Sequence, residues 1–450
     1  MTKNKSILDI FSKFIFIESV STDRSKHDEI LKAVEYLENE LELIGFKISI
    51  FEKDNGPPLI IGQYSSVKSN LKAKKTIGVY AHYDVQSADP VEKWDSPPFK
   101  LSSREGKLFG RGVADDKGHI IQILAAVKQL IMENMLTNNI VLIFEGEEEI
   151  GSRNFEYLIN KAKKQLSFQS ESLDKIDIFY ILDMGMKDKN IPQIFYGLRG
   201  IMTGELKIKT GTTDLHSGIY GNRVINPAQI LAELLTKIKN VKTNKIKIPG
   251  FYDRFKRASR KEINILSEFL LSTKEEKQNA GVKEFINNPL SSKILPSFEV
   301  NGIFSGYTGQ GVKTIIPSEA SLKFSFRLVP DQRPEEIKKI TEKYIKNNLP
   351  KELDYTLSID CGCSSFYTNY DNIYIKKTAQ ILSEVFNNKT YFNRSGGSIA
   401  AAGIIQKLFL KPIVLTGFTL PDENIHAPNE NINEEVFFKG IQVLKKIFSQ

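Results

Sequence analysis

Four short apolar runs constrain the fold of this chain more than any other sequence feature. These continuous runs of β-branched and aromatic residues span residues 76–81, 139–144, 176–182 and 412–417. Strands that are apolar on both faces are typical of parallel sheets with helices packed on each side. The segments 28–44 and 117–133 carry apolar residues at helical spacing. We therefore predict an α/β fold with a mostly parallel sheet.

The middle of the chain has a different pattern. Residues 205–210 and 320–328 alternate between apolar and polar side chains, which is typical of strands with one buried face. Amphipathic helices are expected at 227–238 and 334–347, and the Lys-rich stretch 255–284 is expected to be helical and exposed. This part of the chain is predicted to form an α+β domain.

The strand predicted at 412–417 follows this α+β segment, so the segment is predicted to be inserted into the first domain. The predicted boundaries give a first domain made of residues 1–202 and 369–450, and a second made of residues 203–368. A chain of 450 residues is long enough to build more than one core.

Composition excludes several classes of protein. The chain has 62 Lys and Arg against 54 Asp and Glu, and the two signs alternate, so a nucleic-acid platform is disfavoured. No apolar run reaches membrane-spanning length, and Asp9 and Lys13 interrupt the stretch 7–17, so neither a membrane span nor a signal peptide is expected. Cys361 and Cys363 are too close in sequence for an ordinary disulfide, and we expect free thiols in a reducing, cytoplasmic setting.

Acids and histidines follow the four predicted strands, directly after three of them and after a short loop in the fourth. They are His82, Asp84, Glu145, Glu147, Glu148, Glu149, Asp183 and His426. In open α/β sheets, ligands bind beyond the carboxyl ends of the strands. One strand that ends in a charged residue would only indicate contact with water. Four such strands indicate a functional site.

The residue types indicate a metal site. Imidazoles and carboxylates without a thiolate suit Zn²⁺, Mn²⁺ or Co²⁺. His82 and Asp84 point to the same side of an extended segment, so Asp84 could orient the imidazole. Asp115 follows a glycine-rich turn and precedes a helix, where a helix cap is the simpler alternative. The triplet 147–149 could be a solvated loop, but at the end of a buried strand it favours a metal ligand with a general base.

The remaining candidates have simpler interpretations from the residues alone. His216 would be a structural or surface histidine. His27 and His119 are interpreted as structural and expected to tolerate substitution. The run Gly396-Gly397-Ser398 could be a turn, or could provide backbone N–H donors for an anionic substrate group.

Several motifs, taken in order, resemble those of the M20 metallopeptidases. They are His82-Tyr-Asp84-Val-Gln, Gly110-Arg-Gly112-Val-Ala-Asp115-Asp116-Lys-Gly118, Glu145-Gly-Glu-Glu148-Glu149-Ile-Gly-Ser152, Asp214-Leu-His216-Ser-Gly218 and Gly396-Gly397-Ser398-Ile. Three further stretches, 94–99, 248–253 and 306–317, resemble the carnosinase-like, cytosolic dipeptidase branch. The resemblance covers nearly the whole chain.

The resemblance implies a role for each matching residue. His82 and Asp183 would hold one metal ion, Glu149 and His426 the other, and Asp115 would bridge them. Asp84 would orient His82, and Glu148 would be the general base and acid. A cis peptide bond is implied between Asp115 and Asp116. The first domain would then be catalytic, and the second would be a lid and dimerisation domain.

The resemblance also implies how substrate binds. His216 would reach across a homodimer and act as an oxyanion donor in the neighbouring active site. The residues that would hold the substrate's free carboxylate are Arg327, Gly396, Gly397 and Ser398, with Thr314 nearby. Ser395 is a departure, because relatives of this branch usually carry an acid there that helps to form the pocket for the substrate's amino end.

We therefore expect a homodimeric dipeptidase with two divalent ions, Zn²⁺ before Mn²⁺ or Co²⁺. An N-acyl-amino-acid deacylase or desuccinylase of the same family is the alternative, and Asp183 in place of Glu favours the dipeptidase. A metal-binding scaffold without turnover is disfavoured because ligands and base are all present. A nucleic-acid binder would show steeply salt-dependent binding, and none is expected.

Overall fold

The computed structural model describes residues 2–66, 75–167, 172–268, 270 and 273–450. The chain divides into two compact units, each built from more than one segment. Unit 1 contains Met1–Tyr196, Tyr367–Asn393 and Ile404–Gln450. Unit 2 contains Gly197–Phe366 and Arg394–Gly403. The catalytic, lid and dimerisation roles assigned to the sequence-based domains stay predictions.

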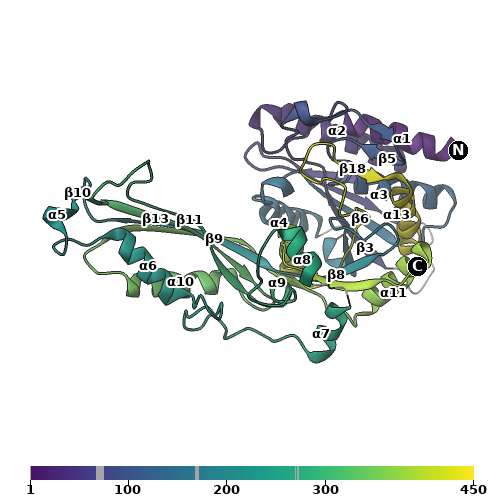
Figure 1. The fold of residues 1–450 in the computed structure, drawn as a ribbon. Coiled ribbons are helices and arrows are strands. Elements are labelled where there is room, and N and C mark those ends of the chain that lie inside the picture. Colours follow the sequence, from purple (N-terminus) through teal and green to yellow (C-terminus); the bar gives the residue numbers. More distant parts are fainter. Residues whose placement is uncertain (1, 67–74, 168–171, 269, 271–272) are drawn as a thin grey trace. The chain divides into compact units, whose positions relative to one another are not determined.

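The main sheet of unit 1 is mixed, with a parallel centre (Figure 1). Its strands lie in the order β1 (Lys47–Phe51), β2 (Leu59–Tyr64), β6 (Asn139–Glu145), β3 (Thr76–His82), β7 (Ile178–Ile181), β17 (Ile413–Leu415), β8 (Gln193–Leu198) and β15 (Phe366–Tyr367), and β16 (Tyr391–Ser395) also pairs with β8. The four central strands β6, β3, β7 and β17 are parallel. They are the four predicted strands, so the predicted fold class is confirmed. The sheet becomes antiparallel where β2 joins β6 and where β8 joins β17.

Helices supply the apolar partners of this sheet. They are α1 (Thr2–Ile15), α2 (His27–Ile44), α3 (Lys117–Met132), α4 (Phe155–Leu166), α11 (Ile373–Phe386), α12 (Ala400–Phe409) and α13 (Glu434–Phe448). α3 is apolar around most of its surface because it packs against α1, α2, α13 and β3. Stacked rings of Phe11 and Phe437 join α1 to α13. Gly45, at φ 95°, ends α2 in the left-handed conformation that glycine adopts without strain.

Short elements complete unit 1. A small antiparallel sheet contains β4 (Ser102–Arg104), β5 (Lys107–Phe109) and β18 (Asn431–Asn433). Single 3₁₀ turns lie at Arg24–Lys26, Val91–Lys93, Glu148–Ile150 and Leu173–Lys175. The pairing of β18 with β5 brings the chain after His426 alongside the glycine-rich turn that begins at Gly110.

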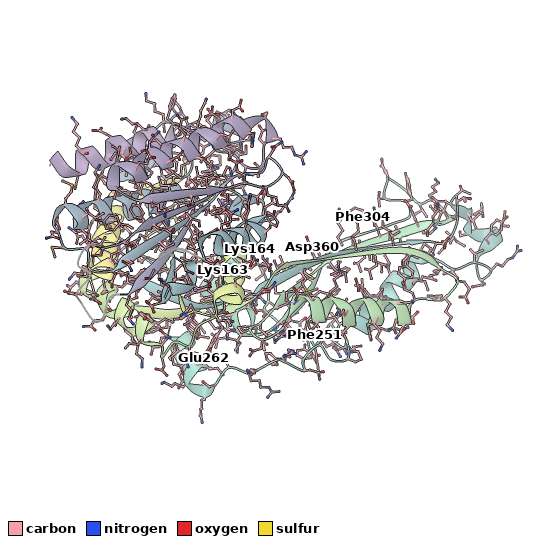
Figure 2. All side chains as sticks on the ribbon, turned by 180° about the vertical axis from the view of Figure 1, so that it is seen from behind. Lys163, Lys164, Phe251, Glu262, Phe304 and Asp360 are labelled. Carbon is pink, nitrogen blue, oxygen red and sulfur yellow. The ribbon has the colours of Figure 1, made fainter. Side chains whose placement is uncertain are left out.

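Unit 2 is built on an antiparallel sheet with one covered face. The strand order is β11 (Ser297–Ser305), β13 (Glu319–Leu328), β9 (Gly200–Lys209) and β14 (Asp354–Cys363). Alternate residues of β13 are buried in one core with α6 (Pro227–Ile238) and α10 (Pro334–Asn348). Phe251 belongs to this core, whereas Phe304 is exposed beside Ser321 on the other face (Figure 2). The predicted alternation and both predicted helices are confirmed.

The Lys-rich stretch 255–284 was predicted correctly only in part. It contains two short helices, α7 (Arg260–Ser267) and α8 (Thr273–Ala280), with residues 269 and 271–272 outside the described part. α7 is not simply exposed, because Glu262 and Leu266 are buried. Beyond it lie α9 (Ser291–Ile294), the pair β10 (Leu215–His216) and β12 (Ile315–Ile316), and α5 (Ser217–Tyr220).

Two further expectations can be compared with the structure. Neither Cys361 nor Cys363 forms a disulfide. Among the helices of the described residues, none is both long enough and apolar enough to cross a membrane.

Candidate metal centre

Five predicted ligand residues lie together at the carboxyl ends of the parallel strands. His82 is the last residue of β3, and Asp183 follows β7. Glu149 lies in the 3₁₀ turn after β6, Asp115 precedes α3, and His426 lies in the loop between β17 and β18. The parallel arrangement of β6, β3, β7 and β17 therefore brings residues from five distant parts of the sequence to one edge of the sheet.

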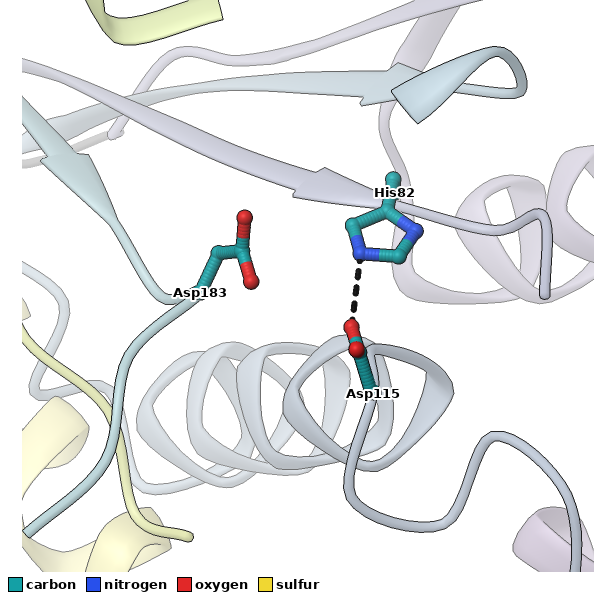
Figure 3. Close-up of side chains that lie close together, drawn as sticks. All are labelled: His82, Asp115 and Asp183. Atoms are coloured by element: carbon teal, nitrogen blue, oxygen red, sulfur yellow. Dashed lines mark hydrogen bonds and ion pairs between the residues drawn. The ribbon is translucent and has the colours of Figure 1, made fainter. Parts of the chain in front are cut away.

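These side chains form two groups that share Asp115, and Figure 3 shows the first of them. One group is His82, Asp115 and Asp183, and the other is Asp115, Glu149 and His426; in each, the potential ligand atoms lie within 4.8 Å of one another. Asp115 Oδ1 lies 2.9 Å from His82 Nε2, and Asp115 Oδ2 lies 3.0 Å from His426 Nε2. Each oxygen of Asp115 therefore faces a different imidazole, which is the arrangement expected of a bridging carboxylate.

The electrostatics of this cluster favour bound cations. Hydrogen bonds to Asp115 and Glu149 raise the pKa of His426 to about 10, which reflects the negative potential that these acids create at the imidazole. Burial and the nearby acids raise the pKa of Asp183 well above its usual range. Glu149 Oε1 is buried and has no hydrogen-bond partner among the described residues. Carboxylates that repel one another and lack donors are stabilised by divalent ions, so these residues fit a metal pair.

Glu148 is close to the two groups but belongs to neither. Burial raises the pKa of its carboxyl to about 7, and the negative charges of Asp115 and Asp84 add to this rise. Its backbone N–H donates to Asp84 Oδ1 at 3.2 Å. A carboxylate that titrates near neutral pH beside a metal site has the properties of a general base.

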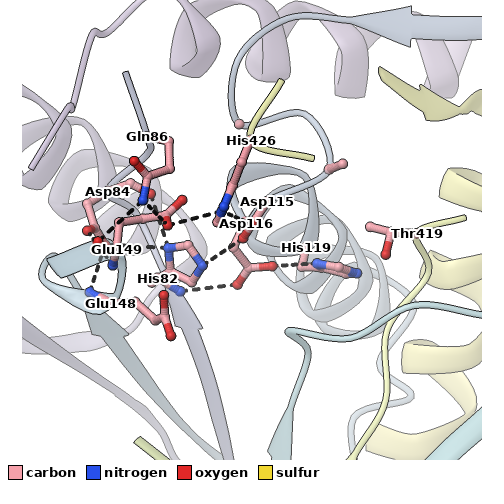
Figure 4. Close-up of polar contacts among 12 residues, drawn as sticks. His82, Asp84, Gln86, Asp115, Asp116, His119, Glu148, Glu149, Thr419 and His426 are labelled. Carbon is pink, nitrogen blue, oxygen red and sulfur yellow. Dashed lines mark hydrogen bonds and ion pairs between the residues drawn. The ribbon is translucent and has the colours of Figure 1, made fainter. Parts of the chain in front are cut away.

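Asp84 and Gln86 hold the ligand residues in position through polar contacts (Figure 4). Asp84 is fully buried, and its Oδ1 lies 3.4 Å from His82 Nδ1. Its Oδ2 accepts the Glu149 N–H at 3.1 Å. Gln86 Nε2 donates to Glu149 Oε2 at 2.9 Å. Asp84 thus joins the end of β3 to the turn that carries Glu148 and Glu149, and Gln86 is a contact that the sequence analysis missed.

His119 is structural, and its contacts argue against the expectation that it tolerates substitution. Its ring is 1% exposed and is bonded at both nitrogens. Nε2 accepts the Phe418 N–H at 2.9 Å, so Nδ1 carries the proton and donates to Asp116. The other oxygen of Asp116 accepts the His82 N–H. The expected cis peptide bond joins Asp115 to Asp116. His119 therefore connects α3 to the segment that follows β17.

Glu430 holds the turn that carries Asp115, and the sequence analysis missed it. Its buried carboxylate accepts hydrogen bonds from Arg111 Nη1 at 2.6 Å and from the backbone N–H groups of Gly112, Ala114 and Asp115 at 2.9–3.1 Å. Arg111 is also buried. Two features of the sequence could have indicated this contact: Arg111 lies inside the glycine-rich turn, and the acid Glu430 follows His426 closely.

The predicted substrate residues lie in unit 2, in two separate places. Arg327 Nη1 donates to Ser398 Oγ at 2.9 Å. His216 is exposed, and Thr314 lies beside it because the Thr314 carbonyl accepts the Ser217 N–H. The length of β13 separates the two places, about 26 Å at 3.3 Å per residue from Glu319 to Arg327. Within one chain, Thr314 therefore lies near His216 and not near Arg327, where the sequence analysis expected it.

Known proteins identify the family. The model of peptidase family M20/M25/M40 matches residues 78–450. This chain belongs to that family. Its relatives include the Cys-Gly metallodipeptidase dug1 of Schizosaccharomyces pombe, 27% identical over 466 residues, which cover 98% of this chain and 94% of the relative. The Beta-Ala-His dipeptidase of Homo sapiens is 28% identical over 401 residues, which cover 87% of this chain and 77% of the relative. The predicted resemblance to the carnosinase-like branch of M20 metallopeptidases is confirmed.

Solved structures share the fold along the whole chain. The M20 family metallo-carboxypeptidase Sso-CP2 from Sulfolobus solfataricus is 29% identical, with a TM-score of 0.84 and 98% of each chain covered. The di-peptidase Dug1p of Saccharomyces cerevisiae is 26% identical, with a TM-score of 0.78, covering 100% of this chain and 96% of that chain.

Proposed function

We propose that this M20 family peptidase hydrolyses dipeptides by using two divalent metal ions. The observation that carries the proposal is the pair of ligand groups that share Asp115 at the carboxyl ends of the parallel strands. Metallodipeptidase relatives that align with nearly the whole chain support the same activity. The five ligand residues are those named from the sequence.

His82 and Asp183 would hold one ion, Glu149 and His426 the second, and Asp115 both. This mixture of imidazole and carboxylate suits Zn²⁺ first, with Mn²⁺ or Co²⁺ as alternatives. Ions bound there would polarise the scissile carbonyl and provide a nucleophilic water at neutral pH. Asp84 keeps the His82 ring in place, because its carboxylate and carbonyl oxygens both lie near Nδ1.

Glu148 would take a proton from the attacking water and later deliver it to the leaving amine. Its carboxyl is next to the ligands without belonging to either group, so it could exchange a proton with a water held there. The backbone bond to Asp84 fixes the turn from which Glu148 projects.

Arg327 and Ser398 would hold the free carboxylate of the substrate, with Gly396 and Gly397 supplying backbone around it. The hydrogen bond between Arg327 and Ser398 already brings the guanidinium to the glycine-rich turn. A guanidinium can bind a carboxylate through two parallel bonds. Ser395, which takes the place of an acid, leaves the preference for the substrate's amino end open to experiment.

We further propose a cytoplasmic homodimer in which His216 completes the neighbouring active site. His216 and Thr314 are exposed together near one end of β13. β11 is an edge strand, and Ile303 and Phe304 on it are 51% and 60% exposed, which favours a protein partner along this strand.

A panel of free dipeptides, N-acetyl amino acids and longer peptides, assayed with Zn²⁺ or Mn²⁺, tests the activity. The proposal predicts metal-dependent release of amino acids from dipeptides. Hydrolysis of N-acetyl amino acids alone would identify the deacylase alternative, and hydrolysis of longer peptides alone would indicate a carboxypeptidase. If no substrate is hydrolysed, the proposed activity is wrong and the alternative of a metal-binding protein without turnover is favoured.

Complementation between two inactive variants tests the shared active site. Glu148→Gln and His216→Ala chains are mixed under conditions that exchange subunits. If His216 acts across the dimer, each mixed dimer has one complete site, and random exchange restores about a quarter of the activity. If His216 acts within its own chain, or not at all, mixing restores none.

A further inference from the structure

Unit 2 contains a cavity of about 840 Å³ with a strongly positive lining. Its charged side chains are five cations and one acid: Arg199, Lys239, Lys245, Arg257, Arg327 and Glu299. The acid is already neutralised, because both oxygens of Glu299 lie 3.2–3.3 Å from Lys239 Nζ. Four positive charges therefore remain around the cavity, which favours an anionic ligand.

The two arginines at one side of the cavity are held by the surrounding backbone. Arg199 is 9% exposed, with Nε donating to the Gly396 carbonyl and Nη1 to the Leu295 carbonyl. Arg327 donates to Ser398, so both guanidiniums contact the same glycine-rich turn. Arg327 and burial together lower the pKa of Arg199 to about 10, burial being the larger cause, and an anion bound between the two guanidiniums would relieve their repulsion.

The segment that carries Arg257 is anchored to the same turn. Ser259 caps α7 by accepting the Glu262 N–H, which starts the helix just after Arg257. Glu262 (Figure 2) forms a buried ion pair with Arg394 Nη1 at 3.2 Å, at the end of β16 immediately before Ser395. The position of Arg257 on the cavity wall is therefore set by a buried contact, although the side chain itself is exposed.

We propose that this cavity accepts the side chain of an acidic C-terminal residue, so that the preferred substrates are dipeptides ending in Asp or Glu. The inference rests on the proposed function, in which Arg327 and Ser398 bind the α-carboxylate. From there the cavity extends to Lys245 and Arg257, which would attract a second carboxylate. The same charges would disfavour a substrate ending in Lys or Arg.

Matched substrates test this preference. Ala-Glu and Ala-Gln are nearly identical in shape and differ in charge, so the ratio of their kcat/KM values isolates the charge. We expect Ala-Glu to be favoured at least tenfold, and Ala-Lys to be the poorest of the three. A ratio near one for Ala-Glu over Ala-Gln, with both hydrolysed, overturns the inference and leaves the proposed function intact.

Two variants locate the effect. The double change Lys245→Met with Arg257→Met is expected to bring the Ala-Glu to Ala-Gln ratio close to one. Lys256→Met is the matched control, because Lys256 is exposed, pairs with Asp331 and does not line the cavity. An unchanged ratio in the double variant overturns the assignment of the cavity.

A binding measurement separates the failure of this inference from failure of the proposed function. Calorimetric titration with L-glutamate and L-glutamine needs no turnover. Tighter binding of glutamate, lost in the double variant, supports the anionic pocket even if no dipeptide is hydrolysed. Equal binding of the two amino acids overturns it.

Discussion

Glu430 and Glu149 are both buried carboxylates of unit 1, but their surroundings differ. Glu430 receives four hydrogen bonds, from Arg111 and from three backbone N–H groups between Gly112 and Asp115. The side chain of Glu149 is 3% exposed; Gln86 donates to its Oε2, which also lies 3.1 Å from His426 Nε2, and its Oε1 has no partner among the described residues. Burying a carboxylate is costly unless donors or cations compensate it. Donors of the protein satisfy both oxygens of Glu430, whereas Oε1 of Glu149 has no donor and is open to a cation.

The comparison indicates how the metal centre is built. Asp115 takes part in both environments, because its backbone N–H donates to Glu430 while its carboxylate faces His82 and His426. Glu430, whose oxygens all have donors, therefore fixes the backbone that carries Asp115 into the ligand cluster. A structural acid and a ligand acid can be told apart by counting their donors.

The largest expected effect concerns Glu148, the acid beside the two ligand groups that belongs to neither. Glu148→Gln should lower kcat by about 10²–10⁴-fold, because the proton acceptor is lost and the shape is kept. Metal content measured by elemental analysis should stay at the wild-type level. Retained turnover would show that Glu148 is not the base, and loss of metal would show that it is a ligand.

Glu430→Gln should destabilise the protein with or without metal. The change leaves Arg111 buried beside a neutral partner, and breaking a buried ion pair costs about 3–5 kcal/mol. Chemical denaturation of metal-free and metal-loaded protein measures the loss. Glu435→Gln is the control, because its ion pairs with Lys189 and Lys439 are at the surface and contribute at most about 1 kcal/mol. A loss seen only in the metal-loaded protein would contradict the structural role.

His119→Leu should cost about 1–3 kcal/mol of unfolding free energy, since it leaves the buried Phe418 N–H and Asp116 without their partner. His27→Leu is the matched control, because His27 is only partly buried at the start of α2. Equal stability of the two variants would show that the His119 contacts are unimportant.

The smallest stability effect is expected for Glu149→Gln in the metal-free protein. The change relieves repulsion between adjacent carboxylates but weakens the contact with His426 Nε2 at 3.1 Å, so the two effects should offset and the unfolding free energy should change little. The same variant should bind fewer metal ions than the wild type. A clear destabilisation of the metal-free variant would mean that Glu149, like Glu430, is compensated by the protein.

Local sequence patterns predicted the parts of the fold that depend on periodicity. The four central strands follow from apolar runs and the amphipathic helices of unit 2 from helical spacing, whereas the full ligand set, with Asp115, came from the resemblance to the M20 metallopeptidases. The antiparallel strands at the sides of the large sheet were missed because Leu59–Tyr64 and Gln193–Leu198 carry no signal for strand direction. Direction is decided by which strand each one pairs with.

Contacts between distant parts of the chain could not be predicted in this way. Glu430 and Arg111 are 319 positions apart, and His119 and Phe418 are 299 positions apart. A histidine at the start of an apolar helix gives no local sign of a backbone donor so far along the sequence. The ligand residues were recognisable because strand ends and motifs mark them, whereas the residues that position them have no such mark.

The most direct test of the central claim is the metal content of the active enzyme, measured by elemental analysis together with dipeptide turnover during stepwise chelation and reloading. The account predicts two divalent ions per chain at full activity. It also predicts that Asp115→Asn loses both turnover and tight binding of both ions, because Asp115 belongs to both ligand groups. Full activity with one ion or none, or a full metal load in Asp115→Asn, would contradict the account.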